Sequence, residues 1–146
     1  MESIILKLST VSKQEIEKVG AKAANLGELI RNKFSVPEGF IVTTTVYSNF
    51  LENNELTRII QDSLSNIDFT NYISIEEHAK KIQDAFNGSQ MSNDVLNEIK
   101  KEYERLESRE VVVRSSATAE DSEGASFAGQ QETFLKIGRA SCRERV

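Results

Sequence analysis

Cysteine, histidine and proline each occur once in this chain of 146 residues. A single cysteine, Cys142, excludes an internal disulfide and argues against a cysteine-based metal site. A single histidine, His78, excludes a histidine cluster for metal binding or triad chemistry within the chain. His78 follows two glutamates off the apolar face of its segment, so we expect a solvated surface histidine rather than a catalytic one.

Long apolar runs and an excess of basic residues are also absent. No run reaches the length of a transmembrane helix, and the N-terminus lacks the basic start and small-residue cleavage site of a secretory signal. The net charge of −5 argues against general nucleic-acid binding. Because 38% of the residues are hydrophobic, the chain can bury a core, and its length suits one domain or part of one. We therefore expect a cytoplasmic protein without membrane or nucleic-acid partners.

The C-terminal stretch Ile137–Val146, IGRASCRERV, differs in composition from the rest of the chain. It carries three arginines in ten residues and has no helix or strand pattern. A common sequencing adapter gives this string when translated in one frame, with Lys136 as the junction codon. We therefore expect residues 136–146 to be a non-native tail, to be excluded from fold reasoning, and residues 1–135 to be the natural part. The alternative is a genuine basic tail.

The most informative stretch is VRSSATAEDSEGASFAGQQETFL, which spans Val113–Leu135. An apolar run leads into Arg114, a loop rich in hydroxyls and small residues follows, and a second apolar run begins at Thr133. This pattern predicts a strand, a loop whose backbone can approach a ligand closely, and a second strand. A guanidinium at the end of the first strand can bind phosphate oxygens through paired hydrogen bonds. The alternative is an ordinary hairpin with a surface arginine.

A second informative stretch surrounds Gly20. The apolar residues after it share one helical face and predict a helix from about Lys22 to Asn32. Gly20 breaks the backbone just before this helix, which would leave unpaired N–H groups and a positive helix end beside Lys22. Such an end can bind an anion, although Lys22 could equally be a solvated lysine of the first turn.

The remaining elements complete an α+β order. Short strands are expected at Ile4–Leu8 and Ile41–Thr43, and Ser12 with Glu15 has the spacing of a capping box. Asn53–Glu107 is expected to be helical, with a second capping box at Ser74 and Glu77. Its three apolar stripes, expected to face a core, are Leu56, Ile59, Ile60 and Leu64; Ile75, Ala79, Ile82 and Phe86; and Val95, Leu96, Ile99, Tyr103 and Leu106.

Three strings in this sequence resemble one known family. They are VGAKAANLGE from Val19, VPEGF from Val36, and the long stretch from Val113. They are similar to the ATP-binding domain of the phosphoenolpyruvate synthase (pyruvate, water dikinase) and pyruvate, phosphate dikinase family, which also includes rifampicin phosphotransferases. The chain has Ala21 where that family usually has a second glycine. The resemblance implies an ATP-grasp fold, of which this chain would be the truncated N-terminal part, with ATP and Mg²⁺ as cofactors.

The resemblance also implies roles for individual residues. Lys22 and Arg114 match the family positions that contact the phosphates of ATP. The other residues of the matching loop that would bind the nucleotide are Ser115, Ser116, Gly129 and Gln130. No catalytic residue and no metal ligand are expected in this chain, because the implied Mg²⁺ ligands come from later sequence.

The implied activity is that of a phosphotransferase. In this family ATP phosphorylates a histidine on a separate domain, and the phosphoryl group then passes to pyruvate, giving phosphoenolpyruvate, AMP and phosphate. Pyruvate would bind to C-terminal domains that this chain lacks, so the chain alone is expected to be inactive. The alternatives are an antibiotic phosphotransferase of the rifampicin type and a non-catalytic nucleotide-binding module.

Overall fold

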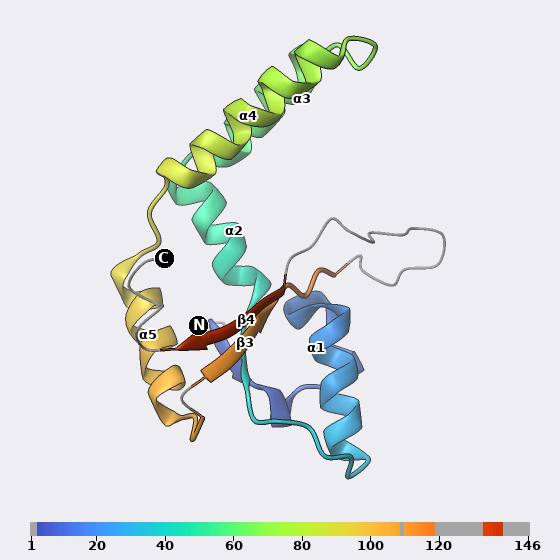
Figure 1. The fold of residues 1–146 in the computed structure, drawn as a ribbon, viewed down its shortest axis with the longest axis vertical. Helices are drawn as coiled ribbons and strands as arrows, with labels where there is room; N and C mark the ends of the chain where they lie inside the picture. The colour runs from blue at the N-terminus through green and yellow to red at the C-terminus, as the bar shows by residue number, and fades with distance from the viewer. Residues whose placement is uncertain (1–2, 109, 119–132, 139–146) are drawn as a thin grey trace. The chain divides into compact units, whose positions relative to one another are not determined.

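The computed structural model describes residues 3–108, 110–118 and 133–138. The chain forms two compact units (Figure 1). The first comprises residues 1–44 and 97–146, and the second comprises residues 45–96. The described part mixes helices with two small sheets, which agrees with the predicted α+β class. Among the described helices, none is both long enough and apolar enough to cross a membrane.

The first unit begins with a two-stranded antiparallel sheet. Strand β1 (Ile5–Lys7) pairs with β2 (Phe40–Val42), with Leu6 opposite Ile41. Both predicted strands are therefore confirmed to within one or two residues. The buried cluster beside this sheet combines residues from the sheet, from the turn after β1 and from the first helix. It consists of Leu8, Val11, Val19, Ala23, Ala24 and Ile41.

Two short 3₁₀ turns, η1 (Leu8–Thr10) and η2 (Lys13–Glu15), lead into the first helix. The predicted capping box is present. The Ser12 hydroxyl accepts from the Gln14 N–H at 3.2 Å, and the Glu15 carboxylate accepts from the Ser12 N–H at 2.8 Å. The Ser12 hydroxyl also donates to Glu15, at 2.5 Å. These bonds from the hydroxyl and then from the backbone of Ser12 lower the pKa of Glu15, because they favour the charged carboxylate.

Helix α1 (Ile16–Arg31) is divided by a kink at Gly20, where φ is +78° and ψ is 166°. The segment after the kink corresponds to the predicted helix, and Asn32 caps its end. Further along, Gly27 lies directly against the turn before η2. A Cβ at Gly27 would meet the carbonyl oxygen of Val11 at 2.2 Å, so the absence of a side chain permits the close packing of α1 on this turn.

The second sheet of the first unit pairs β3 (Glu110–Arg114) with β4 (Thr133–Gly138) in antiparallel fashion. Val113 lies opposite Phe134 and Val111 opposite Ile137, so β4 contains one residue more than β3 between these pairs. Ile137 and Gly138 belong to this strand. The expectation that no strand pattern continues into Ile137–Val146 is therefore wrong for its first two residues, because each has a pairing partner on β3.

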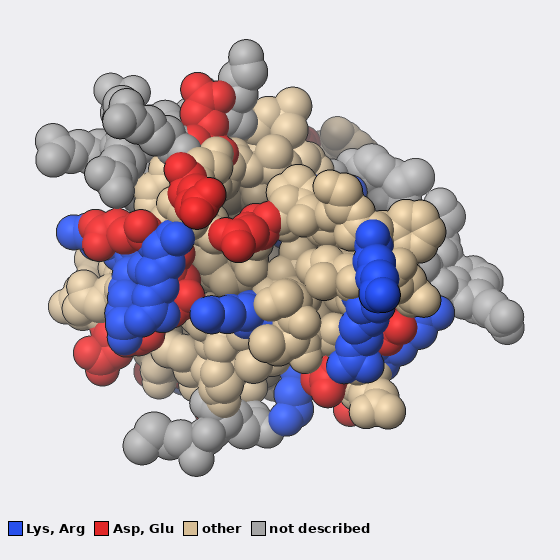
Figure 2. Space-filling model, turned by 90° about the horizontal axis from the view of Figure 1, so that it is seen from below, with Lys and Arg blue, Asp and Glu red and all other residues tan. Residues whose placement is uncertain are grey.

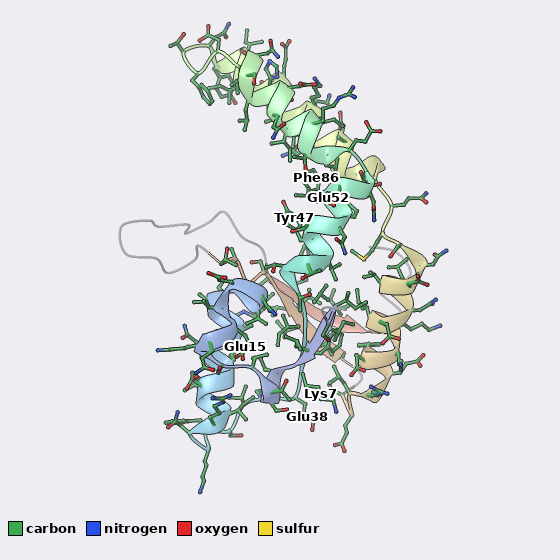
Figure 3. All side chains as sticks on the ribbon, turned by 180° about the vertical axis from the view of Figure 1, so that it is seen from behind. Lys7, Glu15, Glu38, Tyr47, Glu52 and Phe86 are labelled. Atoms are coloured by element: carbon green, nitrogen blue, oxygen red, sulfur yellow. The ribbon has the colours of Figure 1, made fainter. Side chains whose placement is uncertain are left out.

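The remaining helices are α2 (Thr44–Asn53), α3 (Leu56–Asn66), α4 (Tyr72–Gly88) and α5 (Asn93–Arg105). Within the second unit, Phe50 of α2 and Phe86 of α4 have ring centroids 6.1 Å apart, and Phe86 is labelled in Figure 3. Leu56 of α3 is buried, which agrees with its predicted stripe. The stripes of α4 and α5 are only partly buried, since neither helix has a fully buried residue.

Two expectations for α4 are wrong. The helix starts at Tyr72, where the Asn71 side chain accepts from the Ile73 N–H, whereas Ser74 had been expected to form a capping box. The Ser74 hydroxyl instead accepts from the Asp68 N–H in the preceding turn, at 3.0 Å. His78 is not a fully solvated surface residue either. Its side chain is half-buried, and Nδ1 is buried without a hydrogen-bond partner among the residues that the structure describes.

Candidate functional site

Two sequence stretches far apart in the chain meet at the start of the second segment of α1 (Figure 1). The Ala21 N–H donates to the carbonyl oxygen of Ala117 at 3.2 Å, and the Ala23 N–H donates to the Ser116 hydroxyl at 3.1 Å. Ser116 and Ala117 follow directly after β3. The structure therefore brings together the two stretches that the sequence singled out, across a separation of 93 residues between Ala23 and Ser116.

Gly20 makes this close approach possible. A Cβ at Gly20 would lie 2.0 Å from the Ser116 carbonyl oxygen and 2.5 Å from its hydroxyl oxygen, distances that no real side chain tolerates. The positive φ of Gly20 is also a conformation that residues with a Cβ rarely adopt. Both the dihedral angle and the contact therefore require glycine here.

Ala21 replaces the second glycine that the resembling family usually has, and it fits its position without backbone strain. In the described ranges, positive φ values occur at Gly20, Lys33 and Glu55, so the unusual dihedral lies one residue before Ala21. The Ala21 side chain is buried, with 5% of its surface exposed. The local turn thus depends on Gly20 and tolerates a methyl group at the next residue.

Lys22 and Arg114 are held close together by this junction. Lys22 is half-buried and precedes Ala23, whereas Arg114 is exposed and ends β3 two residues before Ser116. The chain spacing and the bond from Ala23 to Ser116 keep the Cα atoms of Lys22 and Arg114 within about 15 Å of each other. Two long cationic side chains at this separation can converge on one anion of the size of a triphosphate. Ser115, also exposed, lies between Arg114 and Ser116 in the chain.

The expected open helix end is partly wrong. The sequence predicted unpaired N–H groups at the start of the helix as an anion seat, but the N–H groups of Ala21 and Ala23 are hydrogen-bonded to Ala117 and Ser116. The physical reason is the Gly20 conformation, which lets the β3 loop contact the helix end. Binding of an anion here would therefore depend mainly on the side chains of Lys22 and Arg114.

The other expected site features have different outcomes. Gly129 and Gln130 lie outside the described residues. Among the residues that are described, no group of three or more His, Cys, Asp or Glu side chains could hold a metal ion. Basic and acidic side chains are interspersed over the face shown in Figure 2. Because the net charge of the chain is −5, a phosphate ligand would need a local cluster of cations and not a generally basic protein.

Sequence reasoning missed the contact between Gly20 and Ser116 and the role of Ala117. A signal for it was present in the run of small residues on both sides of Lys22. Gly20, Ala21, Ala23 and Ala24 are all buried. Small residues on consecutive positions of a helix start permit another backbone to approach, although they do not indicate which backbone it is.

Comparison with known proteins decides the family. The profile of the pyruvate phosphate dikinase AMP/ATP-binding domain matches residues 16–145. The chain belongs to this family. The matched residues include the α1 segment after Gly20, helices α2 to α5, and both strands of the second sheet.

Several curated proteins are similar to this chain over most of its length. A probable phosphoenolpyruvate synthase of Staphylothermus marinus is 41% identical over 141 residues, which cover 91% of this chain and 17% of that protein. The phosphoenolpyruvate synthase of Escherichia coli is 33% identical over 142 residues, covering 92% and 18%. The rifampicin phosphotransferase of Bacillus subtilis is 37% identical over 139 residues, covering 94% and 16%. The chain thus spans less than a fifth of the length of these relatives.

Proposed function

We propose that Lys22 and Arg114 bind the phosphates of ATP in the N-terminal part of an ATP-grasp domain that comprises residues 1–135. The observation that carries this proposal is the bond from the Ala23 N–H to Ser116, which holds the helix bearing Lys22 on the strand end bearing Arg114. Membership of an AMP/ATP-binding domain family supports ATP as the ligand. Ser115, Gly129 and Gln130 are proposed as further nucleotide contacts from the same loop.

The proposed reaction is that of a pyruvate, water dikinase. A phosphoryl group of ATP passes to a histidine on another domain and then to the enol oxygen of pyruvate. Water takes the other phosphoryl group, so that AMP, phosphoenolpyruvate and phosphate result. Lys22 and Arg114 would neutralise phosphate charge and hold the phosphates in line, which is the main protein contribution to phosphoryl transfer. Mg²⁺ would supply further charge neutralisation, through ligands that we assign to sequence after residue 135.

A second acceptor is supported by one relative. The similarity to a rifampicin phosphotransferase has nearly the same identity and coverage as the similarity to the phosphoenolpyruvate synthases. The same nucleotide site could therefore deliver its phosphoryl group to an antibiotic hydroxyl. Both reactions use ATP in the same way, so Lys22 and Arg114 have the same roles in either case.

The nucleotide site can be tested by titrating the chain with ATP and Mg²⁺ in a calorimeter. We expect Arg114→Ala and Lys22→Ala each to weaken binding by about 10- to 100-fold, because a hydrogen bond to a charged group contributes about 1.5–3 kcal/mol. Arg58→Ala is the matched control, since Arg58 forms an exposed ion pair with Glu55 in the other unit. If Arg114→Ala and the unaltered chain bound ATP with equal affinity, Arg114 would not be part of the site.

We also propose that residues 136–146 are not native. Their string matches a translated adapter, and the change of pairing register in β4 falls between Phe134 and Ile137, at the proposed junction. The family match extends over these residues, which makes a direct test necessary. The test is to sequence the source locus through codon 135. Genomic DNA that encodes IGRASCRERV would contradict the proposal. The reading frame downstream of codon 135 would also show whether a pyruvate-binding or an antibiotic-binding domain follows.

A further inference from the structure

We infer that the Ser116 hydroxyl supplies the capping oxygen for the helical segment after Gly20, and that Ser116 thereby positions Lys22 for ATP, although it lies 93 residues after Ala23 in the chain. This inference rests on the proposed function of Lys22. It assigns Ser116 a role different from the direct nucleotide contact that the family resemblance suggested. Ser116 would act on the ligand through Lys22, as a positioning residue.

The hydrogen bonds have the pattern of a helix cap. A capping side chain accepts from the N–H of the second or third helical residue. After the kink, Gly20 occupies the capping position, and glycine has no side chain that could accept. The third residue of the segment is Ala23, and its N–H donates to the Ser116 hydroxyl at 3.1 Å. Ser116 therefore supplies the oxygen that the local capping residue lacks.

A second hydrogen bond fixes the orientation of the helix start relative to the segment that follows β3. The first residue of the segment, Ala21, donates its N–H to the Ala117 carbonyl oxygen at 3.2 Å. Lys22 thus lies between two amides that are both tied to the segment leaving β3. Its backbone cannot shift relative to that segment without breaking one of these bonds. Ser116 follows Arg114 by only two residues. The cap therefore also limits the distance between Lys22 and Arg114.

Burial supports the same assignment. Ser116 is half-buried, and its carbonyl oxygen and hydroxyl both lie against Gly20, on the helix side of the loop. Its neighbour Ser115 is exposed. Of the two serines after Arg114, Ser116 is therefore the more buried, and its hydroxyl accepts from the helix.

The test compares Ser116→Ala and Ser116→Thr in the full 146-residue chain. Amide exchange at Ala23 is followed by NMR, and ATP·Mg²⁺ affinity is measured by calorimetry. Loss of a cap is expected to speed exchange at Ala23 by about fivefold and to weaken ATP binding by about as much. Threonine retains the hydroxyl. We therefore expect Ser116→Thr to have an Ala23 exchange rate and an ATP affinity close to those of the unaltered chain.

A double-variant cycle separates positioning from direct contact. If Ser116 acts through Lys22, then Ser116→Ala weakens ATP binding far less in a Lys22→Ala background than in the unaltered one. Equal losses in the two backgrounds, with unchanged Ala23 exchange, would overturn the inference and make Ser116 a direct phosphate contact. Faster exchange with unchanged ATP affinity would also overturn the positioning role. If the unaltered chain bound no ATP, the proposed function and the positioning role would both fail, whereas protected exchange at Ala23 would still establish the cap.

Discussion

At the scale of single residues, Gly20 has the most demanding position in the described structure. Its φ of +78° and the 2.0 Å contact that a Cβ would make with the Ser116 carbonyl oxygen are independent reasons for glycine. The first concerns the backbone of α1, and the second concerns the loop after β3. A substitution here should therefore damage both the helix start and the junction that holds the proposed ATP site.

We predict that Gly20→Ala lowers the free energy of unfolding by about 2 kcal/mol or more, because backbone strain and a steric overlap add together. Urea unfolding followed by circular dichroism measures this change. Gly88→Ala is the matched control, since a Cβ at Gly88 meets nothing within 4 Å and no positive φ opposes it. We expect Gly88→Ala to be neutral or slightly stabilising. Similar losses in the two variants would contradict the role given to Gly20.

At the scale of elements, the 3₁₀ turn η2, which leads into α1, has a charged capping box. The Ser12 hydroxyl and N–H lower the pKa of Glu15, so the folded state favours the ionised carboxylate more than the unfolded state does. A lowered folded pKa gives stability that is present above the unfolded pKa and is lost as the pH falls through the folded value. The capping box should therefore stabilise the chain at neutral pH and contribute progressively less in acid.

We predict that Glu15→Gln lowers the melting temperature at pH 7 and that its difference from the unaltered chain shrinks by pH 3. Thermal unfolding at a series of pH values provides the measurement. Glu38→Gln serves as the control, because Glu38 is an exposed acid outside the capping box (both glutamates are labelled in Figure 3). A difference for Glu15→Gln that stays constant between pH 7 and pH 3 would contradict the prediction.

Local elements of this fold were predictable where a short pattern determines them. The Ser12–Glu15 box and the helix after Gly20 are both present. Ser74 shows the limit of such patterns, since Asn71 caps the helix one turn earlier and Ser74 bonds to Asp68. A spacing rule alone cannot decide between two competent caps that lie close together in the chain.

The site was predictable in part, for a different reason. Family resemblance pointed to Lys22 and Arg114, but the bond that unites their elements joins Ala23 to a residue 93 positions away. No local periodicity contains that contact. The buried small residues around Lys22 indicate that something packs there, and only the folded chain identifies the partner as Ser116.

At the scale of the whole molecule, the described residues carry a proposed nucleotide site and a single histidine. The single histidine, His78, lies in the second unit with its Nδ1 buried, so it is not exposed for phosphorylation through that atom. We predict that the 146-residue chain forms no AMP from ATP with pyruvate, as measured by chromatography of the nucleotides. AMP that appears with the unaltered chain and disappears in Arg114→Ala would contradict this.

The division into two units gives a prediction for the stability of the whole chain. The buried cluster lies entirely in the first unit, between Leu8 and Ile41, whereas α4 in the second unit has no fully buried residue. Regions with little burial open at low free energy and exchange their amide protons quickly. We therefore expect hydrogen exchange to be slowest around Ala23 and Ala24 and faster along α4, as measured by mass spectrometry on peptides.

The Gly20→Ala variant makes this expectation sharper. Because Gly20 contacts Ser116 within the first unit, its substitution should speed exchange in α1 and in the β3 region. Exchange along α4 should stay the same, since α4 belongs to the other unit. Exchange that rose equally in α1 and α4 would show that the units unfold as one. The decrease in the free energy of unfolding caused by Gly20→Ala would then apply to the entire chain. The amide protons of the helix bearing Lys22 would be no better protected from exchange than those of the rest.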